Sequence, residues 1–316
     1  MQDPQSITGT KSKPFVIITL GPTGAGKTGL VEQTIIHCKL NSNPPPKVFL
    51  VDDLVVNNQK YKDEVVKIIE KNKMTVATLE NDITKPQVVK EFNDVYGSVR
   101  TSKGCVSSES DNCDNVLDYQ MKTAIEANES FVLEITGFSI PKWVFDINWL
   151  GANTDLYDVF VSCVLVSSLD TLITRNMSRF RQAFTLFMDS QINNPAPRLP
   201  NITKKTFNEN ILTIKETINT MYNQCVLTKN ESICGKKHID RMLLFSNNQR
   251  MRLEFDSTIH KSEDFNEVIT RVYLSNQAGG ARRRRTQKRR RFHKRMNTKK
   301  VRKSIKNKRI RKHPKI

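Results

Sequence analysis

The chain has 316 residues, 37% of them hydrophobic and 26% charged, and carries a formal net charge of +19 at pH 7. This length and apolar content predict a sizeable hydrophobic core, in one large domain or two ordinary ones. No run of about 18 apolar residues occurs and residues 1–6 are polar, so we expect no transmembrane segment, no signal peptide and an intracellular (cytoplasmic or nuclear) protein.

The first predicted elements form a strand, a glycine-rich loop and a helix. We expect residues 1–13 to form a flexible leader, followed by an apolar strand over residues 15–20. The strand runs into the pattern G-x-x-x-x-G-K-[ST], whose residues are Gly21, Pro22, Thr23, Gly24, Ala25, Gly26, Lys27 and Thr28. Residues 29–38 have the apolar spacing of a helix. This order of elements predicts a phosphate-binding loop that binds ATP or GTP.

The residue types in this loop suit the binding of phosphate and magnesium. Glycines allow a tight turn whose N–H groups point at phosphate oxygens. Lys27 places a cation near the β- and γ-phosphates, and the hydroxyl of Thr28 is a predicted Mg²⁺ ligand. The N-terminus of the following helix adds positive potential. ATP and Mg²⁺ are therefore the expected ligands.

The second predicted strand, residues 48–51, ends at two adjacent acids, Asp52 and Asp53. A carboxylate at this position would face the γ-phosphate site and could orient or deprotonate an acceptor hydroxyl. The alternative is that one acid caps a turn or a helix. Two neighbouring acids leave room for both roles.

The third predicted strand, residues 131–135, contains a carboxylate, Glu134. Before it we expect helices at residues 60–71, 86–96 and 115–128, with a polar loop over residues 100–114. A carboxylate inside an apolar strand is costly to bury without a partner. A metal-bound water or the acceptor would supply one, and an ion pair with a lysine is the alternative interpretation.

Arginines follow the fourth predicted strand, residues 159–166. The next predicted helix, residues 169–187, carries Arg175, Arg179 and Arg181. Arg175 and Arg179 are four residues apart and so share a helix face. Arg198 follows in a loop that could act as a lid. Arginines beside a phosphate-binding loop neutralise the charge that develops during phosphoryl transfer, whereas for Arg181 a surface position is favoured.

The alternation of apolar strands and helices predicts the fold class. Further elements are a helix over residues 206–224, a strand over residues 242–245 and a final helix over residues 264–274. Continuous apolar strands with helical crossovers indicate a parallel sheet of about five strands, covered on both faces. The expected fold is an α/β P-loop NTPase, a three-layer sandwich of nucleoside-kinase type. Its ligands should bind at the carboxyl ends of the strands.

The six cysteines form no C-x-x-C motif. Cys38 and Cys163 lie in apolar segments and are interpreted as core thiols. The other four lie in polar segments, as the pairs Cys105 with Cys113 and Cys225 with Cys234. A zinc site using these four, or His238, is an alternative.

Residues 14–275 resemble the zeta-toxin group of P-loop kinases. The loop GPTGAGKT resembles the phosphate loop of that family, and residues 51–65 resemble the segment in which an aspartate acts as general base. The best match gives that role to Asp53. Residues 131–137 are similar to the family's hydrophobic-Glu-Gly-Thr strand, with Glu134 as the acid that contacts substrate and Ile135 where glycine is usual.

The same resemblance extends into the second half of the chain. It implies that Arg175 and Arg198 are the two arginines that stabilise the transferring phosphate. Residues 240–247 are similar to the late strand and asparagine turn near the adenine. Insertions fall near residues 73–115 and 182–200. Bacterial members phosphorylate a nucleotide sugar, but that substrate does not carry over, because its pocket cannot be identified in this sequence.

The C-terminal segment, residues 276–316, is strongly basic. From Gln277 onward it contains 20 lysines and arginines and no acidic residue, so the rest of the chain is close to neutral. Such a segment cannot fold by burial and is expected to be a disordered tail. Its charge suits DNA or RNA phosphates through residues 282–315, and a nuclear address is a compatible alternative.

Two functions follow from these patterns. The first is an ATP-dependent phosphotransferase that moves a γ-phosphoryl group to a hydroxyl of a nucleotide-like or nucleic-acid acceptor, using Lys27, Asp53, Glu134, Arg175 and Arg198. The alternative is a nucleic-acid-binding protein in which the P-loop domain is inactive or regulatory. Neither the base-reading N-K-x-D motif of GTPases nor the Asp-Glu strand end of motor ATPases occurs in the sequence.

Overall fold

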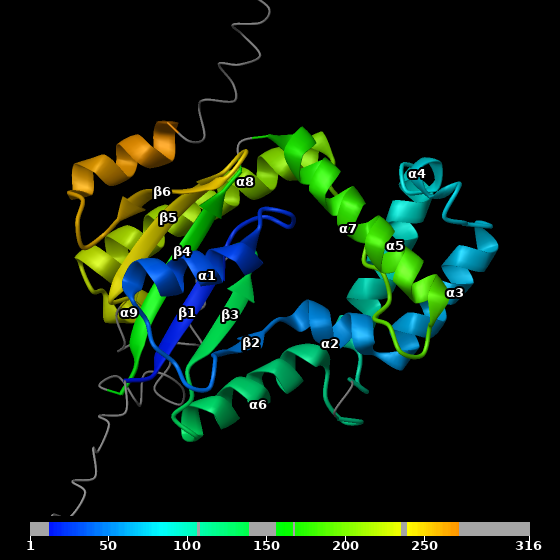
Figure 1. Ribbon diagram of the computed structural model, residues 1–316, viewed down its shortest axis with the longest axis horizontal. Helices are drawn as coiled ribbons and strands as arrows, with labels where there is room; N and C mark the ends of the chain where they lie inside the picture. Colours follow the sequence, from blue (N-terminus) through cyan, green and yellow to red (C-terminus); the bar gives the residue numbers. More distant parts are fainter. Residues whose placement is uncertain (1–12, 106–107, 139–155, 167, 235–238, 272–316) are drawn as a thin grey trace, which may run out of the picture. The chain divides into compact units, whose positions relative to one another are not determined.

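The computed structural model describes residues 13–105, 108–138, 156–166, 168–234 and 239–271. A six-stranded sheet with the order β2-β3-β1-β4-β5-β6 forms its centre (Figure 1). The strands are β1 (Phe15–Leu20), β2 (Lys47–Phe49), β3 (Phe131–Ile135), β4 (Asp158–Leu165), β5 (Arg241–Asn247) and β6 (Met251–Asp256). The first five strands in this order run parallel, and β6 is antiparallel to β5.

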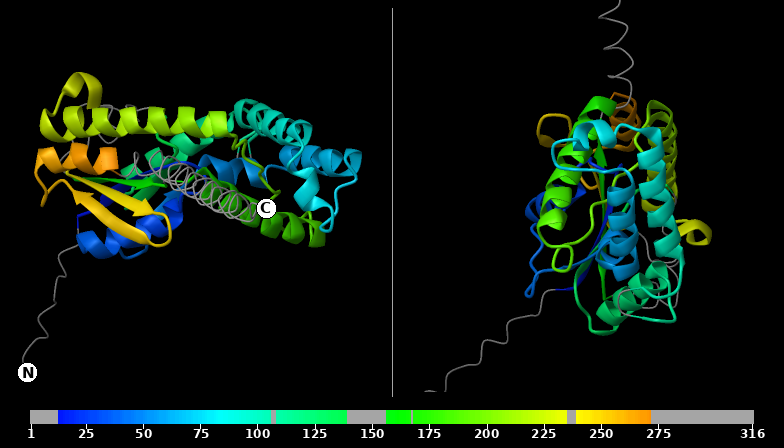
Figure 2. Two further views of the ribbon diagram at one scale, coloured as in Figure 1. Left: turned by 90° about the horizontal axis from the view of Figure 1, so that it is seen from above. Right: turned by 90° about the vertical axis from the view of Figure 1, so that its right-hand side faces the viewer.

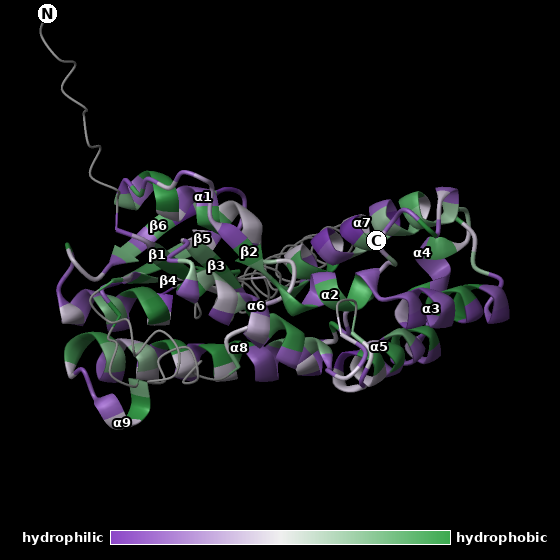
Figure 3. Ribbon diagram, turned by 90° about the horizontal axis from the view of Figure 1, so that it is seen from below, coloured by the Kyte–Doolittle hydropathy of each residue, from purple (hydrophilic) through white to green (hydrophobic). Residues whose placement is uncertain are grey.

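Helices cover both faces of the sheet, as the continuous apolar strands predict. Every residue of β1 is buried, and β1 pairs with β3 on one side and β4 on the other. Helix α1 (Lys27–Cys38) lies on one face, whereas α6 (Cys113–Glu126) and α8 (Lys204–Thr220) lie on the other (Figures 2 and 3). The predicted three-layer P-loop NTPase fold is therefore observed.

A group of helices beside the sheet has a core of its own (Figure 1). Its members are α2 (Val51–Asn57), α3 (Gln59–Lys71), α4 (Leu79–Asp82), α5 (Pro86–Thr101) and the C-terminal half of α7 (Leu169–Asp189). We call this group the helical subregion. Its core contains several aromatic rings, among them Phe92 of α5 and Phe180 of α7, which meet edge to face with centroids 5.4 Å apart.

The remaining described elements complete the chain after α8. These are a π-helical segment (Met221–Leu227), α9 (Glu231–Cys234) and a helix over residues 262–271. No helix in the described part of the chain is long and apolar enough to cross a membrane. The predicted leader and basic tail lie outside the described residues, except for Lys13.

The strand count differs from the sequence-based expectation. Five strands were predicted, and the sixth, β6, was not. It lies at the edge of the sheet and pairs with β5 alone, and only its last two residues, Phe255 and Asp256, are buried. The sequence MRLEFD therefore lacks the continuous apolar run that marked the inner strands.

The position of the paired acids also differs. Strand β2 ends at Phe49, and Asp52 and Asp53 lie in the first turn of α2, not at the end of a strand. After Phe49 the chain leaves the sheet and packs Val55 into the core of the helical subregion. This burial favours a helix for residues that, as a short apolar run, resembled the end of a strand.

Candidate active site

The loop between β1 and α1 has the backbone of a phosphate-binding loop. Gly24 and Gly26 adopt left-handed φ values of 82° and 93°. A Cβ on Gly24 would lie 2.4 Å from the Nδ2 of Asn176, and one on Gly26 would lie 2.5 Å from the Nδ2 of Asn247. Within the fully described α1, the first turn carries no acidic side chain, and Gly26 offers no side-chain cap. The N–H groups of this turn are therefore open to an anion.

Two asparagine side chains hold this loop in place. The Nδ2 of Asn176, in α7, donates to the carbonyl of Thr23 at 3.0 Å. The Nδ2 of Asn247, at the end of β5, donates to the carbonyl of Ala25 at 2.8 Å. Sequence reasoning noted the Asn247 turn through the family resemblance but missed Asn176. A polar residue on the otherwise buried face of α7 was the available signal.

Lys27, at the start of α1, and Glu134, in β3, form an ion pair. The Nζ of Lys27 donates to the carbonyl of Gly21 at 3.1 Å and lies 3.4 Å from the Oε1 of Glu134. Burial lowers the pKa of Lys27, although the adjacent Glu134 opposes the shift. The costly carboxylate inside β3 thus has a lysine partner, and this lysine belongs to the phosphate-binding loop. Thr28 follows in the first turn of α1 with an exposed side chain.

A cavity of about 460 Å³ opens between this pair and the helical subregion. Lys27 and Glu134 line one end of it, together with Arg179 of α7. Asp52 of α2 and Arg198 line the wall that the helical subregion provides. The cavity therefore brings a predicted phosphate-binding lysine, two acids and two arginines together at the carboxyl end of β3.

The two acids of α2 have different surroundings. Both carboxylate oxygens of Asp52 are engaged, one by the hydroxyl of Tyr96 and the other by the guanidinium of Arg198. Asp53 has no side-chain hydrogen bond among the described residues. Although part of its side chain is open to solvent, burial of the rest raises the pKa of Asp53, and the charge of Glu134 raises it further. Asp52, and not Asp53, lines the cavity wall itself.

The arginines separate into three positions. Arg198 and Arg179 line the cavity, whereas Arg175 points to the Asn247 turn, 3.4 Å from the Oδ1 of Asn247. The Nη1 of Arg175 is buried without a hydrogen-bond partner among the described residues. Arg181 is exposed and forms an ion pair with Glu80, which agrees with the surface position expected for it.

The far end of the cavity contains residues that sequence reasoning missed. Arg100, at the end of α5, donates from Nη2 to Asp114 of α6 at 2.7 Å, and Asp118 lies one turn further along α6. Burial raises the pKa of Asp118, and the neighbouring charge of Asp114 adds to the shift. These residues fall in or beside the segment interpreted as a polar loop, so the sequence offered no periodic pattern that placed them at a site.

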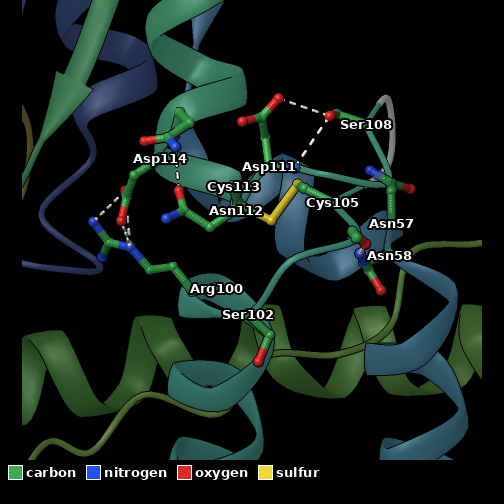
Figure 4. The surroundings of a disulfide bond; sticks show 12 residues. Asn57, Asn58, Arg100, Ser102, Cys105, Ser108, Asp111, Asn112, Cys113 and Asp114 are labelled. Carbon is green, nitrogen blue, oxygen red and sulfur yellow. Dashed lines mark hydrogen bonds and ion pairs between the residues drawn. A yellow bond between two sulfur atoms is a disulfide. The ribbon is translucent and has the colours of Figure 1, made fainter.

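A disulfide bond lies next to this ion pair. Cys105 and Cys113 are joined, and Cys113 directly precedes Asp114 (Figure 4). Cys225 and Cys234 form a second disulfide. The zinc alternative for these four cysteines is therefore wrong, and His238 lies outside the described residues. No cluster of three or more potential metal ligands occurs among the residues that the structure describes.

The residues present fit a magnesium ion that is bound mainly by nucleotide. The glycine cradle and the open helix N-terminus suit phosphate oxygens. The described ranges contain no cluster of carboxylates that could hold a metal ion. Thr28 would therefore contribute one hydroxyl ligand, and the phosphates of the nucleotide would contribute the charged oxygen ligands.

Comparisons with known proteins find no matching family model and no matching curated sequence. Among solved structures, a chain of the PezAT toxin–antitoxin system of Streptococcus pneumoniae is 12% identical, with a TM-score of 0.44, over 85% of this chain and 82% of that one. A candidate kinase from Chloroflexus aurantiacus is 12% identical, with a TM-score of 0.27, over 64% of this chain and 96% of that one.

A third structure, TT1252 from Thermus thermophilus, is 16% identical, with a TM-score of 0.24, over 64% of this chain and 95% of that one. The strand order and the phosphate-binding loop carry the assignment of the chain to the P-loop NTPase fold.

Proposed function

We propose that the chain is an ATP-dependent phosphotransferase that moves the γ-phosphoryl group of ATP to a hydroxyl of a nucleotide-like or nucleic-acid acceptor. One observation carries this proposal: Lys27 of the phosphate-binding loop lines the same cavity as the acids Glu134 and Asp52 and the arginines Arg179 and Arg198. Phosphoryl transfer is catalysed mainly by positioning and by neutralising charge. A cavity with this set of groups supports both.

The nucleotide is assigned to the side of the cavity formed by the phosphate-binding loop. Backbone N–H groups and Lys27 hold its phosphates, and Thr28 holds Mg²⁺, which when bound neutralises negative charge on the phosphate oxygens. Arg175 is assigned to this side as well. Its Nη2 lies 3.4 Å from the Oδ1 of Asn247, whose amide donates to the carbonyl of Ala25 in the loop, and its Nη1 is buried without a partner among the described residues.

The acceptor is assigned to the part of the cavity that faces the helical subregion. Asp53 is exposed and follows the cavity-lining Asp52 in α2, and we assign it the general-base role that the family resemblance implies. Its carboxylate has a raised pKa and no side-chain hydrogen bond among the described residues, so it would take the proton of an acceptor hydroxyl that reaches it from the cavity. The hydroxyl oxygen then bonds to the γ-phosphorus, the bond to the β-phosphate oxygen breaks, and ADP leaves. Glu134 orients the acceptor, while Arg198 and Arg179 neutralise the charge on the transferring group.

The test is transfer of label from γ-labelled ATP, with Mg²⁺, to a panel of nucleosides, nucleotide sugars and 5′-hydroxyl oligonucleotides. We expect label to move to one acceptor class. Lys27→Ala and Asp53→Ala should each lower the rate by about 10²- to 10⁴-fold. Lys60→Ala is the matched control, because Lys60 is an exposed lysine of α3 outside the cavity.

Two outcomes would contradict the proposal. One is transfer that survives in both variants. The other is binding of ATP with no transfer to any acceptor, which would favour the alternative of a nucleic-acid-binding protein with a regulatory P-loop domain.

A further inference from the structure

Tyr96 of α5 contacts two charged groups that meet at the cavity wall. Its hydroxyl donates to the Oδ1 of Asp52, while the guanidinium of Arg198 donates to the Oδ2. The Cζ of Arg198 also lies 4.1 Å from the centroid of the Tyr96 ring. Each of the three side chains therefore contacts the other two. Tyr96 contacts the Asp52 carboxylate through its hydroxyl and the Arg198 guanidinium through the face of its ring.

The backbone on both sides of Arg198 is anchored to the helical subregion. The hydroxyl of Tyr61, in α3, donates to the carbonyl of Pro197 at 3.2 Å. The Nδ2 of Asn93, in α5, donates to the carbonyl of Leu199 at 3.1 Å. The segment expected to act as a lid is thus hydrogen-bonded at the residues before and after Arg198. The side chain of Arg198 therefore lines the cavity from a backbone that hydrogen bonds hold on both sides.

The protonation states of these groups suit the arrangement. Burial raises the pKa of Tyr96 to about 12, so its hydroxyl stays a neutral donor at physiological pH. Burial lowers the pKa of Arg198 to about 10, which still leaves its guanidinium charged. A phenol can donate a hydrogen bond to a carboxylate and offer a π face to a cation at the same time. Phenylalanine retains the π face alone, and leucine retains neither.

We propose that Tyr96 is a positioning residue for the phosphoryl transfer: it fixes the Asp52 carboxylate, and through it directs the Arg198 guanidinium into the cavity. This inference rests on the proposed function. Without the hydroxyl, the Oδ1 of Asp52 lacks its partner, and the carboxylate can rotate and draw Arg198 away from the transferring group. The contacts of Lys27 and Asn247 on the nucleotide side do not involve Tyr96.

The first experiment measures kcat, and KM for ATP, in Tyr96→Phe and Tyr96→Leu. We expect kcat to fall about tenfold in Tyr96→Phe, which loses a hydrogen bond to a charged group, and further in Tyr96→Leu, which also loses the π contact. KM for ATP should stay at the parental value. Tyr157→Phe is the matched control: Tyr157 is fully buried, its hydroxyl donates to the carbonyl of Glu129 at 3.1 Å, and it does not line the cavity.

The second experiment asks whether Tyr96 acts through Arg198. In an Arg198→Ala background, Tyr96→Phe should have no further effect on kcat, because the group that it positions is gone. Additive losses would overturn the proposal, as would parental kcat in Tyr96→Phe or an equal loss in Tyr157→Phe. Failure of the proposed function is a separate result, since the parent chain itself would then transfer label to no acceptor.

Discussion

Asp52 and Asp53 are adjacent in the sequence and yet have different environments. Successive residues of a helix point in different directions, so one acid meets Tyr96 and Arg198 while the other is influenced by Glu134. A carboxylate that already accepts from two donors is held in place as an anion. A carboxylate with a raised pKa and no such donors is better suited to accept a proton.

The pH dependence of transfer tests this division. Asp53 acts as a base only when ionised, and its raised pKa means that kcat should fall as pH decreases through a value above the usual 3.8. Glu134→Gln removes a charge that contributes to the shift, so the acidic limb of the profile should move to lower pH. The measurement is kcat against pH at saturating ATP, with Asp53→Glu expected to retain an acidic limb.

An acidic limb that stays at the same pH in Glu134→Gln would contradict the coupling between the two acids. One that persists unchanged in Asp53→Asn would show that another group accepts the proton.

At the scale of elements, the Cys105–Cys113 disulfide joins the segment after α5 to the first residue of α6. The side chain of Asn112 caps α6 by accepting from the N–H of Asn115 at 2.9 Å. Arg100 and Asp114, which meet across these two elements, line the far end of the cavity (Figure 4). The disulfide therefore connects the segment after α5 to the start of α6 close to the ion pair between Arg100 and Asp114.

Removing this disulfide should weaken binding of the acceptor. We expect the double variant Cys105→Ser with Cys113→Ser, or the reduced parent, to raise KM for the acceptor on the order of 3- to 10-fold, because a small displacement of Asp114 alters the cavity. KM for ATP should not change. The matched control is Cys225→Ser with Cys234→Ser, since that disulfide joins residues that do not line the cavity.

The measurement is steady-state KM for the acceptor and for ATP in both double variants and in the parent chain, with and without reductant. Equal KM values for the acceptor in the two double variants would contradict a specific role for Cys105 and Cys113. Because disulfides persist mainly in oxidising compartments, the reduced form is the relevant one if the predicted intracellular location holds.

For the molecule as a whole, the candidate site combines the sheet with a second core. The sheet and its crossovers provide Lys27 and Glu134, whereas the helical subregion provides Asp52, which accepts a hydrogen bond from Tyr96. Helix α7 takes part in both, since Arg179 lines the cavity and Phe184 packs into the core of the helical subregion. Changes in the helical subregion should therefore affect the acceptor more than the nucleotide.

The basic segment gives a prediction at the same scale, although it lies outside the described residues. Removing residues 278–316 should raise KM for long polynucleotides about tenfold or more at low salt, because lysine and arginine bind phosphates by releasing counterions. KM for mononucleosides should stay unchanged. The measurement is KM for both acceptor types at several salt concentrations, and equal effects on both would contradict a role for the tail in capturing nucleic acid.

Sequence reasoning performed best where chemistry is local. The phosphate-binding loop and the parallel sheet were predicted from short patterns. For Glu134 the alternative of an ion pair with a lysine is the one observed, since its Oε1 lies 3.4 Å from the Nζ of Lys27. Sequence reasoning performed less well where an element depends on its neighbours. Strand β6 is an edge strand without a continuous apolar run, and Asp52 lies in a helix that forms because Val55 is buried in a distant core.

By itself, the sequence determined the phosphate-binding loop and the order of strands and helices, because a tight glycine turn and apolar periodicity are properties of neighbouring residues. Tertiary structure alone decided which acid meets Arg198, which arginines line the cavity, and that Tyr96 contacts the Asp52 and Arg198 side chains of its wall. These residues are far apart along the chain. Their meeting depends on how two cores pack against one another, which no local pattern encodes.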